Sequence, residues 1–150
     1  MTLSRSTFLI AMLFLGLWSR TTPATPRWEV WVVDENGHTL KGMTVRLSWR
    51  NYSAEKQGHE EDRITDKNGY VVFPARTLKA SRSRRAAETA DSARAGVHAS
   101  FGPHASVYAF GQGREGYATT DGPNGQYITD WTGSPPEMQS HIVANVRTNE

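Results

Sequence analysis

The sequence predicts an all-β protein with the architecture of a β-sandwich, and three observations support this fold class. Residues 43–50 alternate apolar and polar side chains with a period of two, which is typical of a strand with one buried face. Asn36-Gly37 and Asn68-Gly69 each adjoin an apolar run, and both residue types tolerate the positive φ that tight turns require. The chain also contains 13 glycines and 7 prolines, which favours many short elements joined by turns.

The first predicted strand spans residues 28–33 and leads into the first turn. Apolar side chains fall on both of its faces, so we expect both faces to be covered. The turn begins at Asp34, whose carboxylate can accept a hydrogen bond from the backbone two residues later. Gly42 then permits a bulge or kink before the alternating strand of residues 43–50. That strand suits an antiparallel sheet with one solvated face.

The same turn chemistry returns after a polar loop at residues 51–61. Ile64 begins a strand, Asp66 opens the second turn, and residues 70–73 form the strand that follows at once. Together with later strands, these segments are expected to build one core. Its expected members are Val30, Val32, Val45, Leu47, Ile64, Val72, Val107 and Ile142.

The order of these elements resembles that of the carboxypeptidase regulatory-like domains. It runs from a strand and a D-x-N-G turn through L-x-G, an alternating strand and a loop to T-D-x-N-G-Y-x-x-F. The resemblance covers roughly the first half of the chain that follows residue 24. It implies a Greek-key sandwich of about seven strands, prealbumin-like or immunoglobulin-like, and a structural module found beside many activities. The matching residues are Val33, Asp34, Asn36, Gly37, Leu40, Gly42, Val45, Leu47, Thr65, Asp66, Asn68, Gly69, Tyr70 and Phe73.

The second half of the chain predicts one insertion and four further strands. Residues 76–95 are rich in Ala, Arg and Glu, which indicates a helical or mobile insertion. Residues 104–110 alternate as a strand, and residues 116–120 are a short partner for it. Residues 126–131 and 142–146 follow as the last two strands, separated by a Gly-Ser-Pro-Pro break.

The insertion at residues 76–95 contains six basic residues and two acidic ones. A functional interpretation is a surface for an anionic partner such as phospholipid head groups, nucleic acid or an acidic polysaccharide. The alternative is a solvated helix or a crossover between the two sheets. We favour this alternative, because an exported chain without net charge has little reason to meet nucleic acid.

The N-terminus predicts a signal peptide at residues 1–24, followed by one sandwich domain at residues 25–150. Residues 8–18 form an apolar run of about eleven residues, which is the usual length of a signal h-region. Ala24 is the expected cleavage position and Ser19 a weaker one. If the segment is not cleaved, it is an anchor, and a membrane is expected as a partner only through it.

Charge and cysteine content limit the cellular compartment and the partners. Residues 1–24 hold Arg5 and Arg20 and no acid, so removing them leaves 15 of the 17 basic residues against 15 acidic ones. This zero formal charge argues against nucleic acid as a partner. The chain has no cysteine, and small exported domains without disulfides are typical of bacteria. We therefore expect a bacterial periplasmic or extracellular protein.

No sequence motif indicates catalysis, and no cofactor or metal is expected. A G-x-S-x-G nucleophile elbow is absent, and the five histidines lack the close spacing of zinc ligands. The expected function is therefore a noncatalytic structural or binding role in the cell envelope. The expected partner is an envelope protein or polysaccharide whose identity the sequence leaves open.

Two alternative functions remain open at this point. The first is a carbohydrate-binding module that uses exposed aromatic rings, although core packing can equally explain those residues. The second is a metalloenzyme, which would use His98, His104 and His141. Intradiol dioxygenases, which share the prealbumin-like fold, hold iron with two tyrosines and two histidines. The residues of those types here are Tyr108, Tyr117, Tyr127 and His141, but they lie in no such motif. The aromatic candidates for carbohydrate binding are Trp49, Tyr52, Tyr127 and Trp131.

Overall fold

The computed structural model describes residues 19–119 and 130–147 and confirms an all-β, sandwich-like protein with one helical insertion. Seven strands follow one another in the main sheet in the order β4-β3-β7-β8-β10-β2-β5. All of their pairings are antiparallel except β2 with β10, which is parallel. The seven strands are β2 (Arg27–Val33), β3 (Thr44–Asn51), β4 (His59–Ile64), β5 (Tyr70–Phe73), β7 (Pro103–Gly111), β8 (Arg114–Thr119) and β10 (Glu137–Val143).

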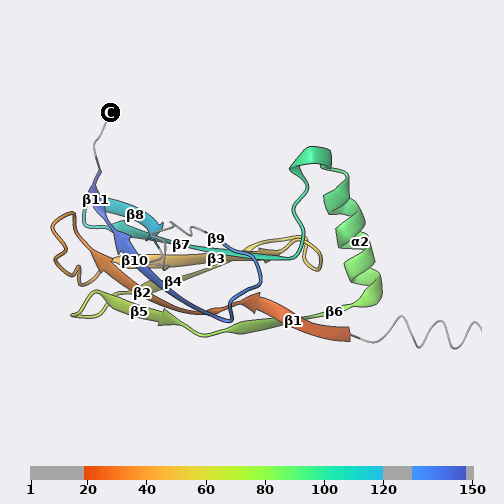
Figure 1. The fold of residues 1–150 in the computed structure, drawn as a ribbon, viewed down its shortest axis with the longest axis horizontal. Helices are drawn as coiled ribbons and strands as arrows, with labels where there is room; N and C mark the ends of the chain where they lie inside the picture. Colours follow the sequence, from red (N-terminus) through yellow and green to blue (C-terminus); the bar gives the residue numbers. More distant parts are fainter. Residues whose placement is uncertain (1–18, 120–129, 148–150) are drawn as a thin grey trace, which may run out of the picture.

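Two short strands extend this sheet, and a separate ribbon stands beside it. Strand β9 (Asp130–Trp131) pairs with β7, and β11 (Asn145–Val146) pairs with β8. Strands β1 (Ser19–Thr25) and β6 (Arg76–Ser81) form a two-stranded antiparallel sheet. Figure 1 shows this ribbon and helix α2 (Arg82–Ala93) at the opposite end of the sandwich from the turn between β2 and β3.

The inward faces of the strands enclose one apolar core. Trp28 is fully buried, and its indole N–H donates to the Ser140 hydroxyl at 2.8 Å, which satisfies both polar groups. The strand register brings these faces together, because Trp28 lies opposite Met138 on β10 and Phe73 on β5. The core consists of Trp28, Val30, Val32, Met43, Val45, Leu47, Val71, Phe73, Ala105, Val107, Ala109, Trp131, Met138, Ile142 and Ala144.

Two of the eight expected core residues lie outside the core. Ile64 ends β4 on the outward face and is 61% exposed. Val72 is half-buried because the register of β5 against β2 turns Val71 and Phe73 inward instead. On the outer face of β2, the Trp31 ring lies between the rings of Tyr70 and His141 on the two neighbouring strands. In the described part of the chain, these side chains cover the outer face that the sequence predicts to be covered.

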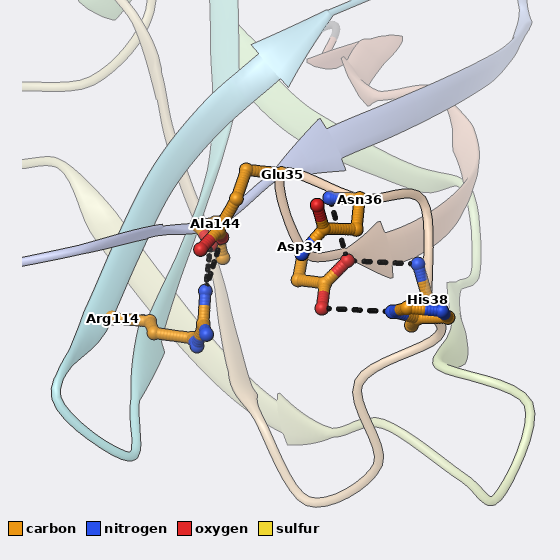
Figure 2. A network of polar contacts seen from close by, with 6 residues as sticks. All are labelled: Asp34, Glu35, Asn36, His38, Arg114 and Ala144. Atoms are coloured by element: carbon orange, nitrogen blue, oxygen red, sulfur yellow. Dashed lines mark hydrogen bonds and ion pairs between the residues drawn. The ribbon is translucent and has the colours of Figure 1, made fainter.

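The turn after β2 forms around the Asp34 carboxylate, as expected. Asp34 Oδ1 accepts from the backbone N–H groups of Asn36 at 2.9 Å and His38 at 2.8 Å (Figure 2). These bonds, that from His38 above all, hold the pKa of Asp34 below its usual range. Glu35 pairs with Arg114, which also donates to the carbonyl of Ala144 at 3.1 Å, so the turn is tied to β8 and to the end of β10.

The turn between β4 and β5 repeats this hydrogen-bond pattern. Asp66 Oδ1 accepts from the backbone N–H groups of Asn68 at 2.8 Å and Tyr70 at 3.0 Å. Gly69 has a φ of 70°, and its carbonyl accepts from Val32 N–H at 2.8 Å. The two turns therefore lie side by side at one end of the sandwich.

Thr65 joins the second turn to the connection that follows the first. Its hydroxyl donates to the Leu40 carbonyl at 2.7 Å and accepts from the Met43 N–H at 2.9 Å. Its backbone N–H donates to the Met43 carbonyl at 2.9 Å. The residue is 3% exposed, so water cannot replace these bonds cheaply.

Polar side chains close the sandwich where the two terminal strands of the sheet, β4 and β5, meet. Arg63 on β4 donates to the Val72 carbonyl on β5 at 2.7 Å, and its guanidinium lies 5.5 Å from the centre of the Phe73 ring. Glu61 pairs with both Arg63 and Arg76. These contacts occupy an edge that would otherwise expose unpaired backbone groups.

The insertion expected at residues 76–95 consists of a six-residue strand followed by a twelve-residue helix. Residues Arg76–Ser81 form β6, and α2 begins after Ser81, whose hydroxyl accepts from the Arg84 N–H at 3.2 Å as an N-cap. No residue of α2 is buried. A single turn of 3₁₀ helix, η1 (Gly96–His98), leads towards β7.

The expected cleavage position at Ala24 lies within β1. Ala24 is 4% exposed, and cleavage after it would separate nearly all of β1 from its partner β6. Within the described residues, helices are too short or too polar to span a membrane. The strand expected at residues 126–131 is represented by β9, because residues 126–129 lie outside the described part of the chain.

The packing of the two turns predicts a large difference between two glycine substitutions. Both Gly37 and Gly69 have positive φ, so Gly37→Ala should cost about 1 kcal/mol of unfolding free energy through backbone strain alone. A Cβ at Gly69 would also lie 2.5 Å from the Val32 carbonyl oxygen, so Gly69→Ala should cost about 3–4 kcal/mol. Urea unfolding measures both; equal losses would contradict the close packing of the turns.

Candidate functional site

The candidate site is an open groove of about 660 Å³ on the outer face of β3, β4, β7 and β9. Its floor is low because two small side chains, Ser48 and Ser106, lie directly opposite each other on β3 and β7. Longer side chains surround them: Glu60 lies opposite Ser48 on β4, and Asp130 lies opposite Ser106 on β9. The antiparallel register of four strands thus places hydroxyl and carboxylate groups around one depression.

One wall of the groove contains a cation, a phenol ring and an imidazole. The Arg50 guanidinium lies 4.5 Å from the centre of the Tyr52 ring, which is a cation–π geometry. The His104 ring meets the Tyr52 ring edge-on, with centroids 5.1 Å apart. His104 Nε2 lies 3.2 Å from the Phe101 carbonyl oxygen. These contacts fix the orientation of all three side chains.

The loop that presents Tyr52 is held by a buried Asn–Glu pair. Asn51 Oδ1 accepts from the Ser53 N–H at 3.1 Å, and Asn51 N–H donates to Glu55 Oε1 at 3.2 Å. Asn51 is 2% and Glu55 6% exposed. The other Glu55 oxygen contacts His59 Nε2. The backbone of Tyr52 is fixed as well, because its N–H donates to the Gly102 carbonyl at 2.9 Å.

Arg46 sets the charge beside the groove. It pairs with Glu60 at 3.0 Å and forms two hydrogen bonds to Asp62 at 2.8 and 2.9 Å. Hydrogen bonding to Arg46 lowers the pKa of Asp62, and the same bond raises the pKa of Arg46. Arg46 therefore partly neutralises the carboxylates of Glu60 and Asp62 on this side of the groove.

The structure brings two of the four aromatic candidates to this groove. Tyr52 lines it and is half-buried. Trp49 also borders it, but it alternates with Ser48 and Arg50, so its ring lies on the inner face of β3 against the core. There the ring stacks on His59 at 5.2 Å and lies 5.0 Å from the Arg76 guanidinium. Trp131 is only 1% exposed and donates to the Pro135 carbonyl, so it packs in the core and not at the surface as a ligand-binding role requires. Tyr127 lies outside the described residues.

The three histidines of the metalloenzyme hypothesis lie on separate elements. His98 is in η1, His104 is the second residue of β7 and lies beside Tyr52, and His141 on β10 stacks on Trp31 at 5.1 Å. Among residues 19–119 and 130–147, no three His, Cys, Asp or Glu side chains lie close enough to share a metal ion. Of the dioxygenase-type residues, Tyr108 and Tyr117 have ring centres 4.9 Å apart, and Tyr108 donates to Glu115 at 2.7 Å.

A second aromatic surface crosses β5, β2 and β10. Tyr70, Trp31 and His141 are register partners, with successive ring centres 5.2 and 5.1 Å apart. Trp31 and His141 are nearly parallel, at 17°. Because this spacing matches the distance of about 4.8 Å between strands, the rings stand upright and turn their faces toward each other. The row is a cross-strand ladder that stabilises the sheet, and it offers little ring face to a ligand.

Sequence reasoning identified Tyr52 and missed the polar lining. Ser48 and Arg50 were recognisable as outward residues of an alternating strand. Their partners Ser106 and His104 could be found only from the pairing of β3 with β7, which joins segments more than fifty residues apart. The assembled groove presents hydroxyl, imidazole, guanidinium and carboxylate groups beside one phenol ring.

Comparison with known proteins identifies no family. No family model and no curated protein matches the chain. Two similar solved structures are 3-chlorocatechol 1,2-dioxygenase from Rhodococcus opacus 1CP, with 15% identity and a TM-score of 0.43, and catechol 1,2-dioxygenase from Acinetobacter radioresistens, with 11% and 0.41. Each similarity covers 87% of this chain, and it covers 61% and 53% of the two enzymes respectively. Similarities of this size support no functional argument for this chain.

The buried Asn51 side chain should govern the order of the loop that presents Tyr52. Asn51→Ala removes the acceptor of the Ser53 N–H, so it should cost about 1–2 kcal/mol of unfolding free energy and speed amide exchange at residues 52–58. Exposed Asn36 provides the control, and Asn36→Ala should change stability by less than about 0.5 kcal/mol. Unchanged exchange at residues 52–58 in Asn51→Ala would show that the loop is held by other contacts.

Proposed function

We propose that this chain is an exported, noncatalytic binding module of the bacterial cell envelope, periplasmic or extracellular, with a carboxypeptidase regulatory-like fold. Its ligand is a polysaccharide that binds in the groove over β3 and β7. The supporting observation is the convergence of Tyr52 with hydrogen-bonding side chains from four strands and a loop on one open depression. An open groove suits a chain of linked sugars better than a small molecule, because such a ligand must be able to extend beyond both ends.

The chemistry of the lining suits hydroxyl-rich ligands. Ser48 and Ser106 can each donate and accept hydrogen bonds, Glu60 accepts them, and Arg50 only donates them. A sugar hydroxyl therefore finds a partner in the groove whether it donates or accepts. Tyr52 adds an apolar ring surface with a polar tip, and such rings suit the mixed apolar and polar faces of a sugar. The side chains are also fixed before binding, which reduces the entropy lost when a ligand binds.

Isothermal titration with a panel of soluble bacterial and plant polysaccharides tests this function. We expect one glycan class to bind, and Tyr52→Ala to weaken that binding at least about tenfold, equivalent to ~1.4 kcal/mol. Arg50→Ala should weaken it as well, because Arg50 both holds the Tyr52 ring and donates hydrogen bonds. Circular dichroism and urea unfolding confirm that each variant retains its fold.

The matched control is Tyr117→Ala, which removes the same side chain from β8, outside the groove, where it is 69% exposed. It should leave the glycan affinity unchanged. Equal losses in Tyr52→Ala and Tyr117→Ala would contradict a binding site in the groove. Absence of binding by any glycan in the panel would contradict the proposed ligand class.

A further inference from the structure

Five basic residues lie where β1, β6 and α2 meet, and we call this end of the molecule the basic corner. Arg20 lies on β1, Lys79 on β6, and three arginines lie in the first turn of α2. The register of the ribbon pairs Arg20 with Ala80 and Thr21 with Lys79, so Arg20 and Lys79 occupy neighbouring positions of the ribbon, on its two faces. Figure 1 shows the start of β1, the end of β6 and the start of α2 at one end of the molecule. The basic corner consists of Arg20, Lys79, Arg82, Arg84 and Arg85.

The cations of the basic corner are not neutralised within the described chain. The sequences of β1, β6 and the first turn of α2 contain no acidic residue, and none of the five cations forms an ion pair with a described residue. The acids Glu88 and Asp91 lie later in α2. Most other arginines are paired with carboxylates: Arg27, Arg46, Arg63, Arg76, Arg94, Arg114 and Arg147.

Arg85 differs from the other four cations of the basic corner because hydrogen bonds hold its side chain. Arg85 Nη2 donates to the Arg20 carbonyl at 3.3 Å and to the Thr22 hydroxyl at 3.0 Å, which attaches the start of α2 to β1. The other four side chains of the basic corner are exposed. Arg84 has one carboxylate nearby, because it lines a small hollow together with Glu55, which is buried and bonded to Asn51 and His59. The excess positive charge therefore faces solvent.

The position of the basic corner in the chain suggests its partner. Strand β1 begins at Ser19, one residue after the end of the apolar run at residues 8–18. Consecutive Cα atoms are about 3.8 Å apart, so whenever that run enters a bilayer, Arg20 and its neighbours lie at the bilayer surface. Clusters of four to eight cations beside an apolar segment suit the negative surface of an anionic membrane.

We propose that, in the chain that retains residues 1–24, the basic corner docks on anionic phospholipid head groups, which would turn the opposite end of the sandwich, with the turns after β2 and β4, away from the bilayer. This inference is independent of the proposed ligand of the groove. It develops the anionic-partner interpretation of residues 76–95, because the structure adds Arg20 to their cations and the described residues form no ion pair with Lys79, Arg82 or Arg84.

Vesicle sedimentation of the full chain tests the proposal. We compare phosphatidylcholine vesicles with vesicles that contain 30% phosphatidylglycerol, so that apolar binding by residues 8–18 is common to both. The anionic lipid should raise the partition coefficient, and 0.5 M salt should remove that gain. In the triple variant Lys79→Gln, Arg82→Gln, Arg84→Gln, the partition coefficient on the anionic vesicles should fall about a hundredfold, because each lost cation should weaken binding about fivefold. Arg85 is left unchanged because it holds α2 on β1.

The matched control removes three exposed cations outside the basic corner: Lys41→Gln, Lys67→Gln, Arg94→Gln. It has the same net charge as the test variant but leaves the basic corner intact. It should therefore keep most of the increase in partition coefficient that phosphatidylglycerol produces. Equal losses in the two triple variants, or no gain from phosphatidylglycerol, would overturn the proposal. Tighter binding to duplex DNA or heparin than to the anionic vesicles would overturn the choice of lipid as partner. Circular dichroism verifies that both variants are folded.

Discussion

The hydroxyl group of Thr65 is the interaction on which the rest of the sandwich depends. It bridges the Leu40 carbonyl and the Met43 N–H, two groups of the connection between β2 and β3 that have become buried. Beside it, Val32 N–H donates to the Gly69 carbonyl, so the turn between β4 and β5 is fixed against β2. The turn after β2 and the turn after β4, which share the D-x-N-G pattern, are thereby held together. Each turn therefore helps to fix the position of the strands next to the other.

These contacts fix where β3 begins, and this position decides which of its side chains line the groove. Because β3 starts directly after the Thr65 contact, its alternation places Val45 and Leu47 in the core and Ser48 and Arg50 on the outside. Pairing with β7 then completes the groove. The ribbon of β1 and β6 presents the basic corner at the end of the sandwich away from the two turns. The groove adjoins that end, because Ser92 of α2 donates to the Tyr52 carbonyl at 2.8 Å and Arg84 lines a hollow with Glu55 and His59. Neither proposed surface requires a change in the core.

The sequence predicted the features that depend on local chemistry. The bonds of Asp34 and Asp66 to their own backbone, the positive φ of Gly37 and Gly69, and the alternation of residues 104–110 all follow from a few neighbouring residues. Which face of a strand is buried was harder to predict where both faces carry apolar side chains. The run Tyr70–Phe73 has no polar residue to mark its outer face, so only pairing with β2 decides that Val71 and not Val72 is buried.

Nonlocal contacts explain the remaining differences, in the fold and in the candidate site. The first six residues of the insertion form a strand because β1 lies beside them, although the composition of residues 76–95 favours helix. Trp131 is in the core because β9 pairs with β7 and aims it inward. In the groove, Tyr52 was predictable as a loop aromatic, but His104 and Ser106 reach it only through the pairing of β3 with β7. Each of these outcomes depends on segments that are distant in the sequence.

Urea unfolding of two Thr65 variants tests the central claim most directly. Thr65→Val keeps the shape but leaves the Met43 N–H and the Leu40 carbonyl without their partner, so it should lose about 2–4 kcal/mol of unfolding free energy. Thr65→Ser keeps the hydroxyl and removes one methyl group, so it should lose only about 1 kcal/mol. A Thr65→Val variant at least as stable as Thr65→Ser would contradict the account.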